Sequence, residues 1–273
     1  MWTARNTMPP PDHPHPAYHG SFYTNRREAT LIAARAILER LFSLIGDVHS
    51  VVDYGCGTGT WLSVATELGA RDVLGIEGPW LDVQLADIAE RSLLLADLEQ
   101  RILLPRRFDL ALSLEGAEHL SPDRAASFVS DLCAAADFVL FSAAVPEQGG
   151  TNHINEQPQS YWAGLFSAVG YAAFDSIRPV IWNDRRIPVW YRQNMLVFAE
   201  PDNPRTQIFA QRCSESDRPP MLDLIHPELY LSARQPPGVR AAAKKLAQAI
   251  GEKAASGVVK LAARPKYGIH RGG

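Results

Sequence analysis

The sequence lacks the features that mark membrane-spanning and secreted proteins. It contains no run of about 18 apolar residues, the length that a membrane-spanning helix needs. The N-terminal residues are rich in proline and histidine where a signal peptide would carry an apolar stretch. Cysteine is scarce: Cys56, Cys133 and Cys213 are an odd number and lack the spacing of metal ligands. We therefore expect a cytoplasmic protein with reduced thiols.

The chain also lacks a strong net charge, since its formal charge at pH 7 is −3. Bulk charge therefore gives no reason to expect a nucleic-acid partner. The charge is unevenly placed, however. From position 234 onward there are nine Lys or Arg residues and one acid, Glu252, a local charge of 9 − 1 = +8. Apolar residues from Val239 to Leu261 recur there at helical spacing.

This pattern predicts a basic amphipathic helix within residues 234–273. Such a helix packs on its own domain or on a second copy of the chain, which would make it the contact of a homodimer. It could instead lie on an acidic membrane, a polyanion or another partner. We expect the helix to pack on its own domain or on a second copy, and we keep binding to a membrane, a polyanion or another partner as the alternative.

Apolar runs alternate with helical repeats between residues 26 and 200. With 46% hydrophobic residues in 273, the chain can bury a substantial core. We expect helices at 26–45, 61–68, 122–136 and 157–169, and strands at 50–54, 72–76, 93–96, 108–114, 137–145, 171–180 and 190–199. The last two strands should pair across a loop. Alternation of this kind predicts a doubly wound α/β fold with a mostly parallel, seven-stranded sheet.

Four regions follow from this pattern. Residues 1–25 should form a flexible arm or a lid, and residues 26–200 should form the main domain. The prolines at 201, 204, 219 and 220 predict a linker or wrap-around loop over residues 201–233. Residues 234–273 should form the basic C-terminal helix and tail, a helical extension of the fold.

A glycine-rich stretch, VVDYGCGTGTWL at 51–62, connects the first expected strand to the next helix. Glycines at this density let the backbone turn sharply and pass close to a ligand. The spacing is Gly55-x-Gly57-x-Gly59, whereas a dinucleotide fingerprint requires Gly-x-Gly-x-x-Gly. Asp53 precedes the first glycine by two residues, and a carboxylate there suits a cationic amino group better than a diphosphate.

Two further acids follow the next strands of the expected sheet. Glu77 ends the strand at 72–76, where a carboxylate can accept hydrogen bonds from both hydroxyls of a ribose. Asp97 follows the strand at 93–96, where it can accept a hydrogen bond from an adenine amino group. Open α/β sheets place their ligands at these carboxyl ends. Each acid alone could be a helix cap or a solvated loop residue, but the three together favour one ligand site.

Asp53, the three glycines, Glu77, Asp97 and the run Phe108-Asp109-Leu110 together resemble the motifs of the class I S-adenosylmethionine-dependent methyltransferases. The resemblance implies a Rossmann-like sheet with an antiparallel edge strand, and S-adenosylmethionine as cofactor. The cofactor-binding residues that it implies are Asp53, Gly55, Cys56, Gly57, Gly59, Glu77, Asp97, Leu98 and Leu114. It says nothing about the methyl acceptor.

A second constellation follows the strand at 108–114. Glu115, Glu118 and His119 have the spacing that puts three groups on one side of a helical turn. His153 follows the neighbouring strand and should face the same cleft. Carboxylates and imidazoles together can hold a divalent cation. The pattern resembles the Glu-x-x-Glu-His…His metal site of small-RNA 2′-O-methyltransferases and a similar run in O-methyltransferases of ubiquinone synthesis, which implies Mg²⁺ or Mn²⁺ bound by Glu115, Glu118, His119 and His153.

Three roles stay open for this constellation. A bound metal could activate an acceptor hydroxyl, which makes Glu118, His119 and His153 the expected catalytic residues. His119 or His153 could instead act as a general base without a metal. All of these residues could also be structural, because an acid at a helix start is stabilised by the helix dipole.

We therefore expect an S-adenosylmethionine-dependent O-methyltransferase, metal-assisted, that acts on a hydroxylated small molecule such as a sugar or glycan diol. One alternative is a metal-independent N- or O-methyltransferase of natural-product biosynthesis with a histidine base. The other is a non-catalytic protein that keeps the fold and binds a partner through its basic helix. The intact glycine loop with Glu77 and Asp97 argues against this last alternative.

Overall fold

The computed structural model describes residues 20–213 and 220–234 of the chain. The chain divides into two units, residues 1–230 and 231–273, and the fold described below belongs to the first. The expected C-terminal helix and nearly all of the expected N-terminal arm lie outside the described residues. Residues 20–25, which we assigned to the arm, instead begin helix α1 (Gly20–Ile45).

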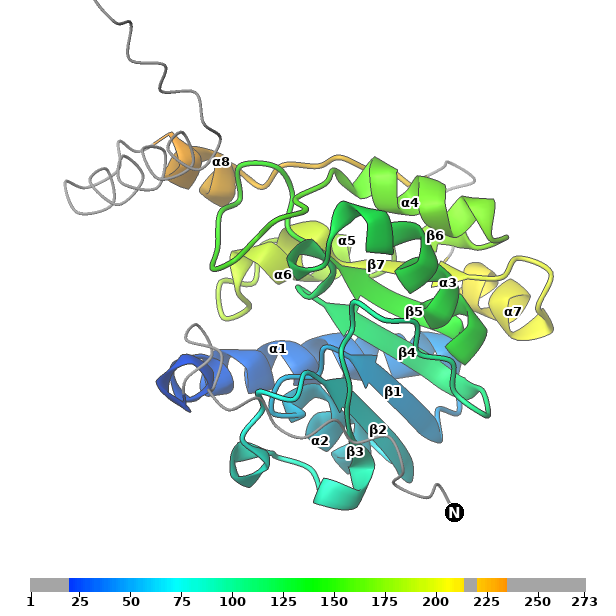
Figure 1. Cartoon of the computed structure of the whole chain (residues 1–273). Coiled ribbons are helices and arrows are strands. Elements are labelled where there is room, and N and C mark those ends of the chain that lie inside the picture. The colour runs from blue at the N-terminus through cyan, green and yellow to red at the C-terminus, as the bar shows by residue number, and fades with distance from the viewer. Residues whose placement is uncertain (1–19, 214–219, 235–273) are drawn as a thin grey trace, which may run out of the picture. The chain divides into compact units, whose positions relative to one another are not determined.

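The centre of the fold is a seven-stranded sheet with the strand order β3-β2-β1-β4-β5-β7-β6 (Figure 1). Its strands are β1 (Ser50–Tyr54), β2 (Asp72–Glu77), β3 (Leu93–Leu95), β4 (Phe108–Leu114), β5 (Ala136–Ser142), β6 (Ala172–Phe174) and β7 (Leu196–Ala199). The first five run parallel, whereas β7 runs antiparallel to both β5 and β6. The predicted α/β fold, with seven strands and antiparallel pairing at one edge, is confirmed.

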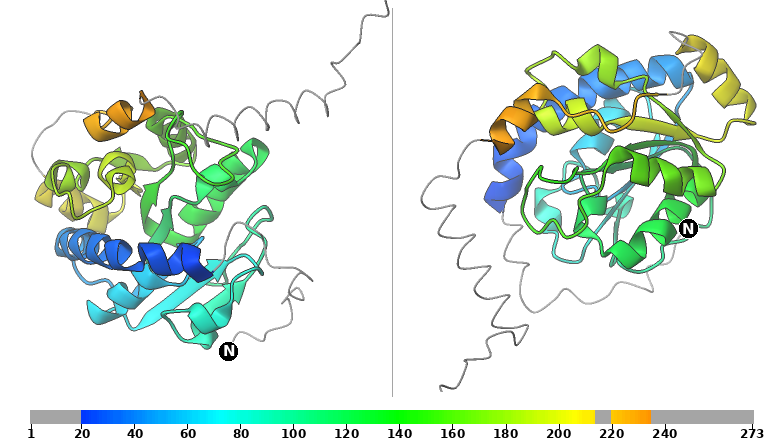
Figure 2. Two further views of the ribbon diagram at one scale, coloured as in Figure 1. Left: turned by 90° about the vertical axis from the view of Figure 1, so that its left-hand side faces the viewer. Right: turned by 90° about the horizontal axis from the view of Figure 1, so that it is seen from above.

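Helices cover both faces of this sheet, which explains why its central strands are apolar on both sides. In β1, Val51 packs into one core with α1 and α2 (Thr60–Glu67), while Val52 packs into the other with α3 (Ala125–Ala135). Helix α4 (Gln159–Ala168) packs against α3, and α7 (Pro204–Arg212) packs against α1. Figure 2 shows α1, in blue, and the green helices on opposite sides of the sheet.

The prediction was wrong over parts of the last two expected strands. Only Ala172–Phe174 and Leu196–Ala199 are extended; α5 (Arg178–Ile181) and α6 (Val189–Asn194) take up most of the remainder. Pro179 lies in the first turn of α5, and Pro188 is the N-cap residue of α6. Proline at such positions is compatible with a helix start, and a short apolar run does not distinguish a buried helix from a strand.

The stretch expected as a linker or loop, 201–233, also contains helices. Asn203 caps α7 by accepting a hydrogen bond from the Arg205 amide, and the fully buried Phe209 packs into the core beneath α1. Residues 221–226 do wrap over the domain, held by the Arg178 guanidinium bound to the Met221 carbonyl. Helix α8 (Pro227–Ala233) follows. None of the helices in the described ranges has the length and apolar character to cross a bilayer.

Candidate active site

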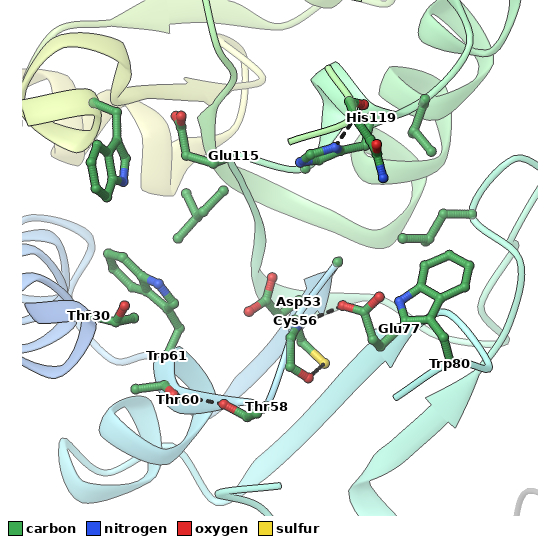
Figure 3. A pocket seen from close by; sticks show the side chains of 18 of the residues that line it. Thr30, Asp53, Cys56, Thr58, Thr60, Trp61, Glu77, Trp80, Glu115 and His119 are labelled. Atoms are coloured by element: carbon green, nitrogen blue, oxygen red, sulfur yellow. Dashed lines mark hydrogen bonds between the residues drawn. The ribbon is translucent and has the colours of Figure 1, made fainter. Parts of the chain in front are cut away.

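A cavity of about 330 Å³ opens at the carboxyl ends of β1, β2 and β4 (Figure 3). The sheet order makes β1 and β4 neighbours, so that Asp53 pairs with Leu112 just before both strands end. The lining of the cavity includes eight of the nine residues predicted to bind the cofactor, namely Asp53, Gly55, Cys56, Gly57, Glu77, Asp97, Leu98 and Leu114. Gly59 is not part of that lining.

The glycine loop needs its glycines for backbone geometry. Gly55, Gly57 and Gly59 have φ angles of 85°, 55° and 79°, in the left-handed region that favours glycine. A Cβ atom on Gly59 would also lie 2.8 Å from Ile88, so this residue serves packing behind the loop. The three glycines thus let the loop turn at the cavity, where it leads into α2.

Asp53 is buried in the cavity wall with only 2% of its surface exposed. No described residue forms a hydrogen bond to its Oδ1 atom. Burial, and then the nearby Glu77 carboxylate, raise its pKa from 3.8 to about 7. A cationic ligand group beside Oδ1 would supply the missing partner and favour the ionised form.

Glu77 and Asp97 are placed differently within the same cavity. The two Glu77 oxygens accept hydrogen bonds from the backbone amides of Gly57 (2.7 Å) and Gly78 (2.8 Å), so this carboxylate also fixes the glycine loop. Burial raises the Glu77 pKa, and these amides oppose the rise. Asp97 is half-buried and accepts a hydrogen bond from the Glu99 amide at 3.0 Å.

Arg27 is a cavity residue that sequence reasoning missed. It comes from α1 and is the one Lys or Arg among the described residues that line the cavity. Its Nε and Nη2 atoms donate to Oδ1 of Asp87 at 3.0 and 2.8 Å, and the other oxygen of Asp87 accepts from the Thr60 hydroxyl. Thr30, one helical turn further along α1, lines the same wall. No periodicity connects Arg27 of α1 to Asp87, 60 residues later, so only the fold reveals this contact.

A group of potential metal ligands lies next to the cavity. Ligand atoms of Glu118, His119 and His153 lie within 4.8 Å of one another. Glu118 and His119 belong to the 3₁₀ turn η3 (Ala117–His119), and the two imidazole rings pack edge to face with centroids 4.9 Å apart. His119 also lines the cavity itself.

Glu118 has the electrostatics of a cation ligand. Its side chain is buried, and neither carboxylate oxygen has a hydrogen bond of standard geometry to a described residue, although the backbone amides of Glu118 and Ala144 lie close enough to act against the rise of its pKa. Burial, followed by the neighbouring Glu115 carboxylate, raises its pKa well above the ordinary value. Nε2 of His153 lies 3.9 Å from Oε1 of Glu118. An unpartnered buried carboxylate of this kind is costly unless a proton or a cation joins it.

The hydrogen bonds of the two histidines determine their tautomers. His153 Nδ1 lies 2.9 Å from Oε1 of Glu156, and His119 Nδ1 lies 3.2 Å from the carbonyl oxygen of Asn152. Both partners only accept, so each neutral ring carries its proton on Nδ1 and its lone pair on Nε2. Glu156 is itself held by the amides of Glu147 and Gly149. A carboxylate behind an imidazole in this way is the usual support of a metal-bound histidine.

Glu115, the fourth predicted ligand, is not part of this group. It follows β4 with a φ of 53° and accepts hydrogen bonds from Gln148 Nε2 at 2.9 Å and Asn194 Nδ2 at 3.1 Å. The expected helical turn begins only at Ala117, so Glu115 does not share a face with Glu118 and His119. The structure therefore does not bring the predicted quartet together, and three of its members form the cluster.

Comparison with known proteins gives a match in structure only. No family model matches the sequence, and no curated protein matches it either. The crystal structure of Streptomyces venezuelae DesVI superposes with a TM-score of 0.51 at 14% identity, covering 67% of this chain and 96% of that one. The fold is a Rossmann-like methyltransferase fold.

Two further structures with this methyltransferase fold align at lower scores. S-adenosylmethionine-bound CalS10, an amino pentose methyltransferase from Micromonospora echinaspora, is 15% identical over 69% of this chain and all of its own, with a TM-score of 0.48. The methyltransferase domain of bacterial CtHen1 is 20% identical over 64% of this chain and 98% of its own, with a TM-score of 0.45.

Proposed function

We propose that the protein is an S-adenosylmethionine-dependent methyltransferase that binds its cofactor in the cavity at the glycine loop. The observation that carries this proposal is the buried Asp53 carboxylate, whose Oδ1 atom lacks a partner among the described residues. An ammonium group supplies the charge and the donors that this atom needs. Glu77 and Asp97, at the ends of the adjacent strands, are the proposed acceptors for the ribose hydroxyls and the adenine amino group.

The same cavity offers a partner for the other charge of an amino-acid head group. We assign the cofactor carboxylate to Arg27, with the Thr30 hydroxyl beside it. Arg27 uses Nε and Nη2 for Asp87, so that Nη1 is available to a ligand. Gly55, Cys56, Gly57, Leu98 and Leu114 complete the proposed cofactor site as the surfaces that contact adenosine, and Gly59 maintains the loop from behind.

Calorimetric titration with S-adenosylhomocysteine tests this assignment without an acceptor. We expect binding by S-adenosylhomocysteine and none by NAD at the same concentration. Binding by NAD alone would refute the cofactor assignment, because it would assign the glycine loop to a pyrophosphate.

For the transfer itself, we propose a divalent cation such as Mg²⁺ or Mn²⁺ held by Glu118, His119 and His153. The Glu118 oxygens and the imidazole nitrogens of His119 and His153 form a mixed oxygen and nitrogen donor set that suits such an ion. When bound, the ion would lower the pKa of an acceptor hydroxyl and fix its orientation. Glu156 would orient His153 toward it.

The proposed acceptor is a hydroxylated small molecule, such as a sugar or glycan with adjacent hydroxyls. Its oxygen attacks the methyl carbon, the carbon–sulfur bond breaks, and the proton of the hydroxyl passes to a base. The products are the methyl ether and S-adenosylhomocysteine. Activity that survives EDTA and does not respond to Mg²⁺ or Mn²⁺ would eliminate the metal from this scheme.

The second candidate is metal-independent transfer to oxygen or nitrogen with a histidine base. The His153–Glu156 contact favours it, because a carboxylate on Nδ1 stabilises the imidazolium that forms when Nε2 takes a proton. Full activity in both His119→Ala and His153→Ala variants would eliminate this candidate.

A further inference from the structure

Glu115 lines the cavity but lies outside the group of potential metal ligands. It lies at the carboxyl end of β4 in the left-handed backbone region, which a residue other than glycine rarely adopts. One carboxylate oxygen accepts from Asn194 and the other from Gln148, and a further bond joins Asn194 to Gln148 at 2.9 Å. Two carboxamides therefore fix the direction of this carboxylate at the cavity wall.

Three aromatic rings line the cavity beside this carboxylate. Tyr191 packs edge to face against Trp61, with centroids 5.4 Å apart, and against Trp190 at 6.0 Å. Burial and then the charge of the Glu115 carboxylate raise the Tyr191 pKa. Figure 3 shows Trp61 and Glu115 on one side of the cavity and His119 on the other.

The cavity as a whole is acidic. Its described lining includes five carboxylates, those of Asp53, Glu77, Asp97, Glu99 and Glu115, and one guanidinium, Arg27, which is paired with Asp87. Glu99 is occupied by the amide and hydroxyl of Ser121, and the proposed cofactor contacts use Asp53, Glu77 and Asp97. S-adenosylmethionine brings a single net positive charge. Glu115 is then the carboxylate that the cofactor contacts do not use.

We propose that Glu115, with the rings of Trp61, Trp190 and Tyr191, forms a subsite for a positively charged amino group of the methyl acceptor. This inference rests on the proposed function and narrows its substrate class to hydroxylated amines. A carboxylate beside aromatic rings recognises an organic ammonium through charge and through the ring quadrupoles. Repulsion from Glu115 disfavours an acceptor that presents a phosphate or carboxylate in place of this amino group.

Ligand-observed NMR on protein saturated with S-adenosylhomocysteine tests the subsite. The probes are glucosamine, glucose and glucose 6-phosphate, which share one ring and differ in charge. We expect glucosamine to bind about tenfold more tightly than glucose, the effect of one partly desolvated charge interaction, and glucose 6-phosphate to be rejected. The Glu115→Gln variant should lose this preference, and Trp190→Leu should weaken glucosamine binding without changing that of S-adenosylhomocysteine.

The matched control is Glu99→Gln, a carboxylate of the same cavity that Ser121 occupies, and it should keep the preference for glucosamine. Equal binding of glucosamine and glucose by the unmodified protein, or absence of glucosamine binding, would overturn the subsite. A Glu115→Gln variant that loses affinity for S-adenosylmethionine but not for S-adenosylhomocysteine would also overturn the subsite, because Glu115 would then bind the sulfonium of the cofactor. Failure to bind S-adenosylhomocysteine at all would instead refute the proposed function.

Discussion

Asp53 is the residue on which the cofactor assignment depends. Its carboxylate is buried and its Oδ1 has no partner among the described residues, so it destabilises the ligand-free protein and is available to a cation. We expect Asp53→Asn to weaken S-adenosylhomocysteine binding by about 10- to 100-fold, the value of a charge-assisted hydrogen bond. Isothermal titration measures this directly. An unchanged affinity would assign the head group to another residue.

The same substitution should change how stability depends on pH. The folded-state pKa of Asp53 is raised from 3.8 to about 7, so the folded protein holds this proton more tightly than the unfolded chain does. Its contribution to stability is therefore complete at low pH and declines as the pH rises from about 4 to about 7, by at most about 4 kcal/mol. Urea unfolding of the ligand-free protein at pH 5 and pH 8 should show a smaller difference for Asp53→Asn than for the unmodified chain.

Arg27 gives a second test at the residue scale, because it is assigned to one part of the cofactor. Arg27→Gln should reduce affinity for S-adenosylhomocysteine by about fivefold, a modest effect since the guanidinium is half-exposed. Methylthioadenosine, which lacks the amino-acid head group, should bind both proteins equally. Arg35→Gln, on the same helix but paired with Glu67, is the control and should leave both affinities unchanged. Equal losses for the two ligands would contradict the carboxylate assignment.

These residues also show which parts of the candidate site could be predicted from the sequence. Asp53, Glu77 and Asp97 could be found because each lies at or just after the carboxyl end of a strand, and the carboxyl ends of parallel strands meet at one edge. Arg27 could not be found, because its contact with the cavity depends on how α1 packs across the sheet. Glu115 lies outside the group formed by Glu118, His119 and His153, because the helical turn begins two residues after it, which spacing alone does not show.

At the scale of elements, the turn η3 and the loop that carries His153 form the proposed metal site. Added Mn²⁺ should raise the melting temperature of the unmodified protein, because it binds the folded state and relieves the buried Glu118 charge. Glu118→Gln should abolish this response and stabilise the metal-free protein. Glu156→Gln should weaken Mn²⁺ binding by about 10- to 100-fold through loss of His153 orientation. A Glu118→Gln protein with an undiminished Mn²⁺ response would exclude this site.

The elements themselves were predictable where an apolar run is clearly bounded by loop residues. Strand β4 has the predicted bounds, and β1, β2 and β3 match within a residue, since buried parallel strands are short apolar runs bounded by loops. The region after α4 was not predictable in the same way. There α5 and α6 are short apolar helices fixed by tertiary contacts, such as the buried Arg192 guanidinium bound to the Ile187 and Trp182 carbonyls.

At the scale of the whole molecule, charge is divided between two parts of the chain. The formal charge of residues 234–273 is +8 and that of the whole chain is −3, so residues 1–233 have a formal charge of −3 − 8 = −11. The described residues that line the cavity fall between Arg27 and Tyr191. Deletion of residues 234–273 should therefore leave S-adenosylhomocysteine affinity unchanged, while a homodimer formed through the C-terminal helix should dissociate in sedimentation experiments. A loss of cofactor affinity on deletion would show that the tail contributes to the site.

The central claim is that the cavity at the glycine loop holds S-adenosylmethionine with a defined orientation. The most direct measurement is a crystal structure of the protein grown with S-adenosylhomocysteine. We predict the amino group at Asp53, the carboxylate at Arg27, the ribose at Glu77 and the adenine amino group at Asp97. Electron density for the ligand elsewhere, or in this cavity with its head group turned away from Asp53, would contradict the account.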